Sequence, residues 1–197
     1  KTYALEAARA AWQASDQQVV GCALSARAAR ELQEQTAIPS TTIARLLGDL
    51  SQGWAPEPCD VLVVDEAGMV GPRAIAQLAR PAEQASVKLV LVGDDRQLPE
   101  IDAGGALAGI ARRIGALELH DVRRQHHEWD RDALAALRDG KIRDWTRAYR
   151  EHERIHTAPS PGKVRERMVD DWWQHANTGS DAVMIANRRS DVADLNR

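Results

Sequence analysis

The chain has 197 residues, which suits one domain or one domain and part of a second. A hydrophobic content of 44% provides enough apolar surface for a packed core and argues against global disorder. The net charge of −3 excludes a protein that binds nucleic acid through overall positive charge, but it is compatible with a local arginine-lined groove.

Apolar runs of strand length alternate along the chain with segments of helical period. In chain order, the patterns predict a helix over 3–15, a strand over 19–24, helices over 26–35 and 41–50, a strand over 60–64, a helix over 73–85, a strand over 87–93, a helix over 104–115, a strand over 116–120, helices over 129–139 and 143–151, a strand over 154–158, a helix over 163–177, a strand over 181–186 and a helix from 190. Strands separated by helices are typical of a parallel sheet with right-handed crossovers, so we predict an α/β fold.

Several local signals refine these elements. Thr41 or Thr42 is suited to cap the helix after it, and Pro81 is expected to bend or end its helix. The strand over 87–93 is fully apolar from Leu89 onward, which predicts burial on both faces. The segment 157–162, TAPSPG, is the best candidate for a hinge or a domain boundary.

The two cysteines are too few for a disulfide framework or a zinc site, so we expect free thiols in a reducing cytoplasm. The sequence has neither an apolar run of membrane-spanning length nor a signal peptide, so we expect no membrane association.

Two of the predicted strands run directly into acidic loops. VLVV is followed by Asp65 and Glu66, and VLVG is followed by Asp94, Asp95 and, shortly after, Gln97. Because the carboxyl ends of parallel strands meet at one edge of a sheet, we expect these side chains to share one crevice. Adjacent carboxylates repel each other, so either both strands simply end in water or the crevice binds a cation. Acid clusters in both loops favour the cation site.

The chain opens on Lys1 and Thr2, followed directly by an Ala-rich helix. Lys-Thr forms the end of the phosphate-binding loop G-x-x-x-x-G-K-[ST], in which the lysine reaches the phosphates and the hydroxyl binds Mg²⁺. On this interpretation the preceding strand and glycines lie in a longer protein from which this chain is a piece. Asp65 then holds Mg²⁺, largely through water, and Glu66 takes a proton from the attacking water. The metal would offset the repulsion between the two carboxylates.

Three segments resemble motifs II, III and IV of RecD-like superfamily-one helicases: VLVVDEAGMVG, VLVGDDRQLPEIDAGG and HDVRRQHHEWDRDAL. The resemblance is strongest to the helicase part of conjugative relaxases of the TraA/TraI/TrwC (MobF) group, and within it to the Ti-type TraA proteins. GCALSARAARELQEQTAIPSTTIARLL is similar to the DNA-contacting motif Ia and the residues after it. DAVMIANRRSDVADLN is similar to the start of the second RecA-like domain.

This resemblance implies ATP and Mg²⁺ as cofactors and assigns roles to matching positions. Lys1 and Thr2 match the end of the Walker A motif, where Thr2 is a Mg²⁺ ligand. Asp65 and Glu66 match Walker B, with Asp65 as the other Mg²⁺ ligand and Glu66 as the catalytic base. Gln97 matches the residue that senses the γ-phosphate and links hydrolysis to the DNA groove.

The resemblance also implies roles for arginines. Arg124 matches the motif IV arginine that reaches the γ-phosphate, for which a planar guanidinium is suited, and Gln125 completes that motif. Ser25 and Arg27 would lie near the phosphates of single-stranded DNA. The alternatives are a solvated basic corner at Arg124 and a polar loop that caps the next helix at Ser25.

Other conspicuous residues have simpler interpretations. His126 and His127 lack a second pair of metal ligands at suitable spacing, so we expect them at the exposed start of a helix. Trp172 and Trp173 could stack on bases, but their helical spacing from apolar neighbours favours a core face. We expect Trp129 to serve packing as well.

The predicted architecture is a P-loop NTPase (RecA-like) sheet flanked by helices over 1–158, truncated at Walker A, with a linker and the start of a second RecA-like domain over 159–197. The predicted function is the motor of a conjugative relaxase, an ATP-dependent helicase or translocase on single-stranded DNA in the cytoplasm. A RecD-type repair helicase and a non-hydrolysing RecA-like DNA-binding module are the alternatives. Relaxosome or conjugation-machinery proteins are expected partners of the parent protein. Without the glycine loop and later motifs, we expect this piece alone to be inactive.

Overall fold

The computed structural model describes residues 2–51, 59–94, 97, 106–119, 125–179 and 181–196. They belong to two compact units, one of residues 1–120 and one of residues 121–197. All the strands of the described residues lie in the first unit, and the second unit is built from helices.

Four parallel strands form the sheet of the first unit, in the order β2-β1-β3-β4. Their bounds are β1 Val19–Ala23, β2 Ser40–Thr42, β3 Val61–Val64 and β4 Lys88–Leu91. The chain moves from β1 outward to β2 and then returns to β3 on the other side of β1, so the strand order reverses between β1 and β3. Such reversal points are where open α/β sheets bind ligands. The α/β fold with a parallel sheet is confirmed.

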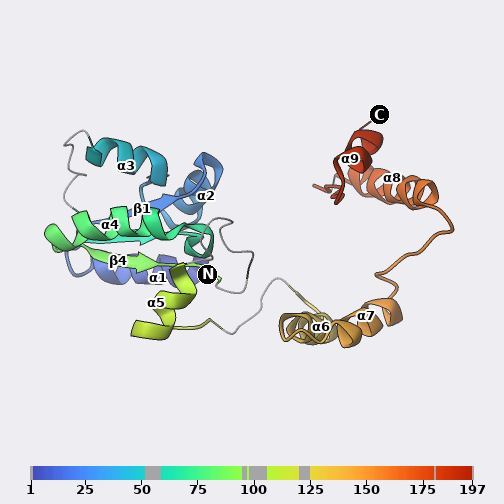
Figure 1. The fold of residues 1–197 in the computed structure, drawn as a ribbon, viewed down its shortest axis with the longest axis horizontal. Helices are drawn as coiled ribbons and strands as arrows, with labels where there is room; N and C mark the ends of the chain where they lie inside the picture. The colour runs from blue at the N-terminus through green and yellow to red at the C-terminus, as the bar shows by residue number, and fades with distance from the viewer. Residues whose placement is uncertain are drawn as a thin grey trace. The chain divides into compact units, whose positions relative to one another are not determined.

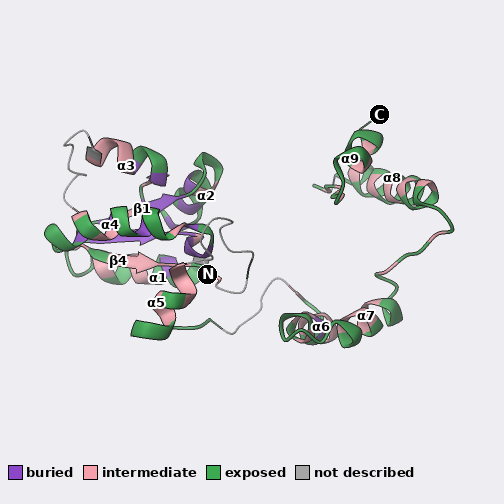
Figure 2. Ribbon diagram, in the orientation of Figure 1, coloured by how far each residue is buried: buried purple, intermediate pink, exposed green. Residues whose placement is uncertain are grey.

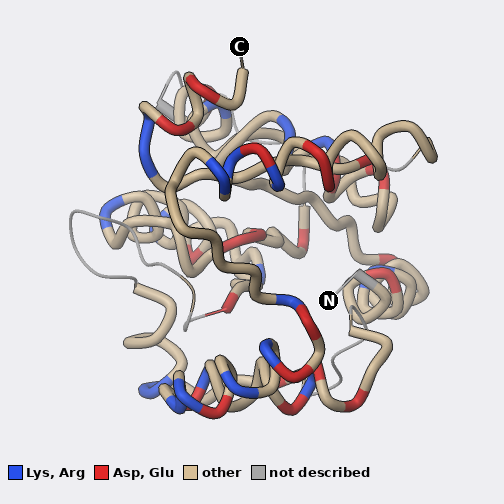
Figure 3. The backbone as a smooth tube through the Cα atoms, turned by 90° about the vertical axis from the view of Figure 1, so that its right-hand side faces the viewer, with Lys and Arg blue, Asp and Glu red and all other residues tan. Residues whose placement is uncertain are grey.

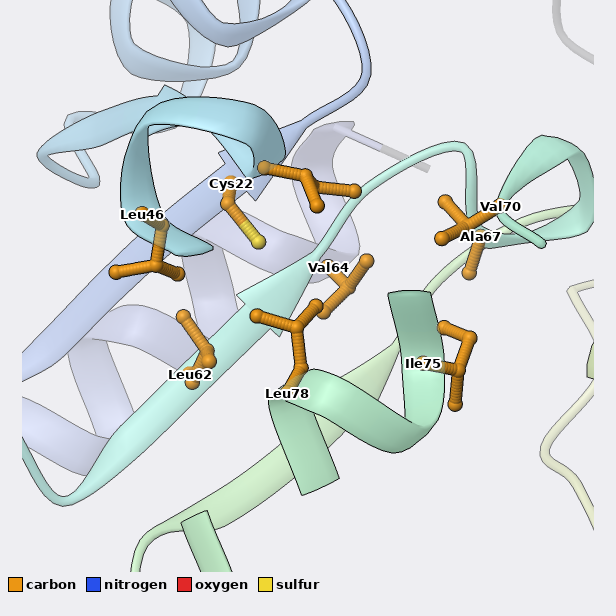
Figure 4. Close-up of a cluster of buried hydrophobic side chains, with 9 residues drawn as sticks. Cys22, Leu46, Leu62, Val64, Ala67, Val70, Ile75 and Leu78 are labelled. Carbon is orange, nitrogen blue, oxygen red and sulfur yellow. The ribbon is translucent and has the colours of Figure 1, made fainter. Parts of the chain in front are cut away.

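Helices cover both faces of this sheet (Figure 1). Their bounds are α1 Thr2–Gln13, α2 Ala26–Thr36, α3 Ile43–Ser51, α4 Pro72–Gln84 and α5 Ala106–Ile114. Alternation along β3 sends side chains to the two faces in turn. Leu62 and Val64 pack with α3 and α4 in one buried cluster, which Figure 4 shows, whereas Val61 and Val63 pack with α1 and α2 in another.

Burial is highest in the middle of the sheet. Every residue of β3 is buried, whereas the residues of β4 are half-buried and Lys88 is exposed (Figure 2). The prediction that this strand is buried on both faces is therefore wrong in the structure. β4 is less buried because it is the last strand on its side of the described sheet and has a neighbouring strand on one side only.

Local capping signals explain where several helices begin and end. Thr42 caps α3, since its Oγ1 accepts a hydrogen bond from the backbone N–H of Arg45 at 3.1 Å. Gly115 ends α5 with a φ of +82°, as a glycine C-cap should. Pro81 lies inside α4, so it does not end the helix, which continues to Gln84.

Three predicted strands do not form in the described residues. The described residues of 116–120 and the segments 154–158 and 181–186 have no regular structure, although the apolar alternation is present. Leu117 is 102% exposed and Ile185 is 84% exposed. A strand is stabilised by hydrogen bonds to a neighbouring strand, and these segments have none in the described structure.

The second unit contains two helix pairs. α6 (Glu128–Arg138) packs against α7 (Ile142–Glu151), and α8 (Pro161–Asn177) contacts α9 (Arg189–Leu195). The first pair is held by aromatic contacts, because Trp129 stacks on His152 with ring centroids 3.7 Å apart. The expected packing role of Trp129 is confirmed.

Polar contacts hold the second pair. Arg165 of α8 forms ion pairs with Asp191 at 2.9 Å and Asp194 at 3.6 Å. Trp172 donates from Nε1 to the carbonyl oxygen of Ala182 at 2.9 Å. Trp173 is 59% exposed, and α8 contains no buried residue, so the core face that we predicted for these tryptophans is not buried in the structure.

The distribution of charged residues and the state of the cysteines complete the description of the fold. Basic and acidic residues are interspersed along the described helices, as the colours of the backbone tube in Figure 3 show. Cys22 and Cys59 are free thiols, and burial raises the pKa of Cys22 to about 12. Within the described residues, no helix has both the length and the apolar character needed to cross a membrane.

Candidate nucleotide-binding site

Asp65 lies directly beyond the carboxyl end of β3, next to the point where the strand order reverses. Its backbone N–H donates to the carbonyl oxygen of Cys22 at 2.9 Å, which extends the pairing of β3 with β1 by one residue. Its side chain is buried, and Oδ1 accepts a hydrogen bond from the N–H of Glu66 at 2.9 Å. A buried carboxylate at a strand end is thus held in one orientation.

Glu66 adopts a left-handed backbone conformation, with φ 52° and ψ 37°. This conformation is unfavourable for a residue with a Cβ atom, and it turns the chain sharply out of β3. A short 3-10 helix, η1 (Ala67–Met69), comes immediately after the turn. The turn separates the two adjacent acids, so Asp65 is buried whereas Glu66 is half-buried.

The loop after β4 lies beside this turn. Val92 donates to the carbonyl oxygen of Val64 at 2.9 Å, and its own carbonyl oxygen accepts from the N–H of Ala67 at 2.8 Å. Asp94 lies two residues further on, and Gln97 contacts it through a backbone bond and a side-chain bond, each of 3.4 Å. The structure therefore places Asp65, Glu66 and the Asp94–Gln97 contact at the same edge of the sheet.

Several predicted site residues lie outside the description. Lys1, Asp95 and Arg124 are not among the described residues, and of Thr2 only the backbone is described. That backbone begins α1, and the start of α1 lies on the side to which the strand arrows point (Figure 1). A short turn joins α1 to β1, so the two elements run in opposite directions and the start of α1 is close to the carboxyl edge.

Ser25 and Arg27 lie at the same edge, at the start of α2. Ser25 caps that helix, since Oγ accepts a hydrogen bond from the N–H of Ala28 at 3.1 Å. The capping alternative for Ser25 is thus observed, although the hydroxyl retains a proton that it can donate to a phosphate. Arg27 is exposed in the first turn of the helix.

A cavity of about 280 Å³ lies close to these residues, between α2, β2 and the start of α3. Arg30, Arg45 and Thr42 are among its lining residues. The sequence motifs do not single out either arginine. The i, i+3 spacing of Arg27 and Arg30 places them on one face of α2, and this spacing was the available signal.

The donor set at the edge fits a magnesium ion held mainly through water. Mg²⁺ prefers oxygen ligands, keeps several waters and is bound by one or two carboxylates together with substrate phosphates. Asp65 supplies such a carboxylate at a fixed position. Among the described residues, no group of three or more His, Cys, Asp or Glu side chains could hold a metal by itself.

Comparison with known proteins identifies the family. The AAA domain family matches residues 1–160, which is most of the chain. A match to this family implies nucleotide binding, with ATP as the nucleotide. The match spans β1 to β4 and the acidic loops at their carboxyl edge.

Curated relatives cover the whole chain. It is 36% identical over 197 residues to the conjugal transfer protein TraA of Rhizobium radiobacter and 35% identical over 198 residues to the probable conjugal transfer protein TraA of Sinorhizobium fredii. In both cases all of the chain is matched, and it spans 18% of the relative's length. The ATP-dependent RecD2 DNA helicase of Deinococcus radiodurans is 38% identical over 109 residues, which is 53% of the chain and 15% of that protein. The resemblance to RecD-like helicases and TraA proteins is therefore confirmed, and the chain belongs to the AAA domain family.

Proposed function

We propose that the chain is part of an ATP-dependent DNA helicase or translocase, the motor of a conjugative-transfer relaxase that acts on single-stranded DNA. The observation that carries this proposal is the contact between two acidic loops at the carboxyl edge of β3 and β4. One loop supplies Asp65 and Glu66, and the other supplies Asp94 and Gln97. The match to TraA proteins covers the whole chain, whereas the match to a RecD-type helicase covers about half of it, which supports the relaxase motor over a repair helicase.

In the proposed mechanism, each residue at the edge has a separate task. Asp65 and the hydroxyl of Thr2 would hold Mg²⁺, which would neutralise charge on the phosphates when bound. Glu66 orients the attacking water and accepts its proton. Lys1 binds the β- and γ-phosphates, and Gln97 contacts the γ-phosphate and the water.

Arg124 is proposed to reach the γ-phosphate, where a guanidinium can form two parallel hydrogen bonds to phosphate oxygens. Ser25 and Arg27 are proposed to contact DNA phosphates. Both lie at the start of α2, just beyond the end of β1, and β1 pairs directly with the strand that Asp65 follows, so nucleotide and DNA would meet the same edge of the sheet. In this arrangement, a change at the nucleotide site would have to act across only one pair of strands to reach the DNA contacts.

The domain boundary is also a proposal. We assign residues 1–158 to a RecA-like domain and residues 159–197 to a linker and the start of a second one. The AAA domain match, which ends at residue 160, supports this boundary. A motor of this kind works in the cytoplasm, and relaxosome or conjugation-machinery proteins are its expected partners.

The test is Glu66→Gln in the full-length protein that contains this chain. The substitution removes the base but leaves Asp65, so ATP turnover should fall by a factor of about 10² to 10⁴ while ATP binding is retained. Glu83→Gln, an exposed position near the end of α4, is the matched control and should leave turnover unchanged. Near-normal steady-state ATPase activity in Glu66→Gln would remove Glu66 from catalysis. An unmodified protein that binds DNA but hydrolyses no ATP would instead favour the non-hydrolysing module.

A further inference from the structure

The loop after β3 and the loop after β4 touch through their backbones at two glycines. A Cβ atom on Gly68 would lie 2.6 Å from the carbonyl oxygen of Asp94, and one on Gly93 would lie 2.8 Å from the backbone nitrogen of Gly68. Neither glycine has a positive φ, so glycine supplies space here rather than a special conformation. Any larger residue at either position would push the two loops apart.

A backbone hydrogen bond and buried apolar packing both hold the two loops together. Between them, the N–H of Ala67 donates to the carbonyl oxygen of Val92 at 2.8 Å. Behind them, Ala67 and Val70 are fully buried, and Leu107 of α5 packs against the same cluster. Because close-packed interiors do not deform smoothly, the two loops cannot separate without opening this part of the core.

The residues proposed to act in hydrolysis lie at the two ends of this contact. Glu66 precedes Ala67 directly in the chain. The carbonyl oxygen of Asp94, which faces Gly68, also accepts from the N–H of Gln97 at 3.4 Å. A displacement of the Gln97 backbone therefore moves the Asp94 carbonyl. Because this carbonyl is packed directly against Gly68, Gly68 must move with it.

We propose that Gly68 and Gly93 are positioning residues that keep the carboxylate of Glu66 in register with the loop that carries Gln97. The two glycines allow the loops to move as one body when the γ-phosphate arrives or leaves. This inference rests on the proposed ATPase function, and it adds two residues that act through Glu66 and Gln97 rather than on the nucleotide.

The first test is Gly68→Ala in the full-length protein. The added methyl group displaces Glu66 relative to the Gln97 loop but removes no group that binds nucleotide. The kcat for ATP hydrolysis should fall at least about tenfold, whereas KM should change by less than about threefold. Gly48→Ala is the matched control, because a Cβ atom there would meet nothing within 4 Å. Its kcat should stay within about twofold of that of the unmodified protein.

A double-mutant cycle separates positioning from general damage. If Gly68 acts through the Gln97 loop, then Gly68→Ala should lower kcat far less in a Gln97→Ala background than in the unmodified protein. Independent effects that multiply in the double variant would overturn the proposal. Unmodified activity in Gly68→Ala would overturn it too while leaving the proposed function intact. An unmodified protein without ATPase activity would overturn both this proposal and the proposed function.

If Gly68→Ala does not fold, two further measurements test whether the glycines act as positioning residues. Gly93→Ala places its methyl group against the same loop from the other side, 3.0 Å from the backbone nitrogen of Ala67 and 3.0 Å from Cδ2 of Leu107, and should give the same split between kcat and KM. Hydrogen exchange of the unmodified protein needs no substitution. A non-hydrolysable ATP analogue should change the exchange of the Ala67 and Gln97 amides together. A change at Gln97 with none at Ala67 would overturn the proposal.

Discussion

At the residue scale, Glu66 combines a strained backbone with a proposed catalytic role. Its φ of 52° is one of five positive values at described non-glycine residues, and Ala37, which ends α2 with a φ of 55°, is another. At Ala37 the conformation closes a helix, whereas at Glu66 it turns a carboxylate out of a buried strand. Proteins retain such strain where the surrounding structure and the function require it.

Glu66→Gly should therefore stabilise the fold or leave it unchanged while abolishing ATPase activity. Glycine adopts a positive φ without a Cβ penalty, and the expected gain in the free energy of unfolding is at most about 1 kcal/mol. Urea unfolding of the 197-residue chain measures it. Ala37→Gly is the control with the same backbone conformation, and it should give a similar gain without loss of activity in the full-length protein. A large destabilisation by Glu66→Gly would show that the carboxylate supports the fold.

A second residue-scale prediction concerns Tyr149 in the α6–α7 pair. Its hydroxyl donates to Oδ1 of Asp130 at 2.6 Å, and this hydrogen bond, followed by burial, raises the pKa of Tyr149 above its ordinary value of 10.0. A raised pKa means that the bond contributes stability below pH 10 and that this contribution is lost as the pH rises through the folded-state pKa.

Tyr149→Phe should cost about 0.5–1.5 kcal/mol at neutral pH, and the difference from the unmodified chain should shrink in strongly alkaline solution. Thermal unfolding followed by circular dichroism at several pH values measures both effects. A difference that grows above the ordinary tyrosine pKa would contradict the assignment of the donor.

At the element scale, the close approach of α2 and β2 to β1 depends on Gly21. A Cβ atom there would lie 2.9 Å from Cδ2 of Leu32 and 3.2 Å from Cγ2 of Ile38, and closer still to Oγ of Ser40. Leu32 and Ile38 belong to the buried cluster under α1 and α2, so they have little room to move.

Gly21→Ala should therefore destabilise the first unit by about 1–3 kcal/mol, the usual cost of overpacking a core. Gly48→Ala in α3 should instead stabilise it by up to about 1 kcal/mol, since alanine is the better helix former and the site is open. The midpoints of urea unfolding compare the two. Equal midpoints would show that the layer around β1 is looser than the distances indicate.

At the scale of the whole molecule, a net charge of −3 means that the proposed DNA binding would have to come from local positive charge. We propose that Arg27 and the two arginines at the cavity, Arg30 and Arg45, supply this charge at the carboxyl edge of β1 and β2. Arg80 lies in the second half of α4, which runs away from that edge.

We expect weak binding of the chain to single-stranded DNA, with an affinity that falls steeply as salt increases. Each phosphate contact on a single strand contributes about −0.7 to the slope of log K against log salt, so Arg27→Ala should flatten the slope by about that amount. Fluorescence anisotropy with a labelled oligonucleotide measures it, and Arg80→Ala is the control. Equal slopes for Arg27→Ala and the unmodified chain would remove Arg27 from the DNA site.

Local sequence patterns were sufficient to predict most helices and strands of the first unit and the edge at which the acids gather. Hydrophobic period and capping residues are local signals, so β3 and the α2 and α4 helices were predictable to within a residue or two. Parallel pairing then forces Asp65 and Asp94 to one edge, whatever the details of packing. The expected roles of the site residues came from the family resemblance, because a hydrophobic period carries no information about chemistry.

The pairing of strand-like segments, by contrast, depends on contacts between distant parts of the chain. SerThrThr over 40–42 has no apolar run, yet it forms β2, because β1 offers it backbone partners and Gly21 gives it space. The apolar segment 181–186 has the stronger local pattern and remains unpaired in the described structure. The left-handed turn at Glu66 and the backbone contact of Gly68 with Asp94 arise in the same way. Hydrogen bonds between strands and contacts between loops join residues far apart in the chain, so no local pattern can specify them.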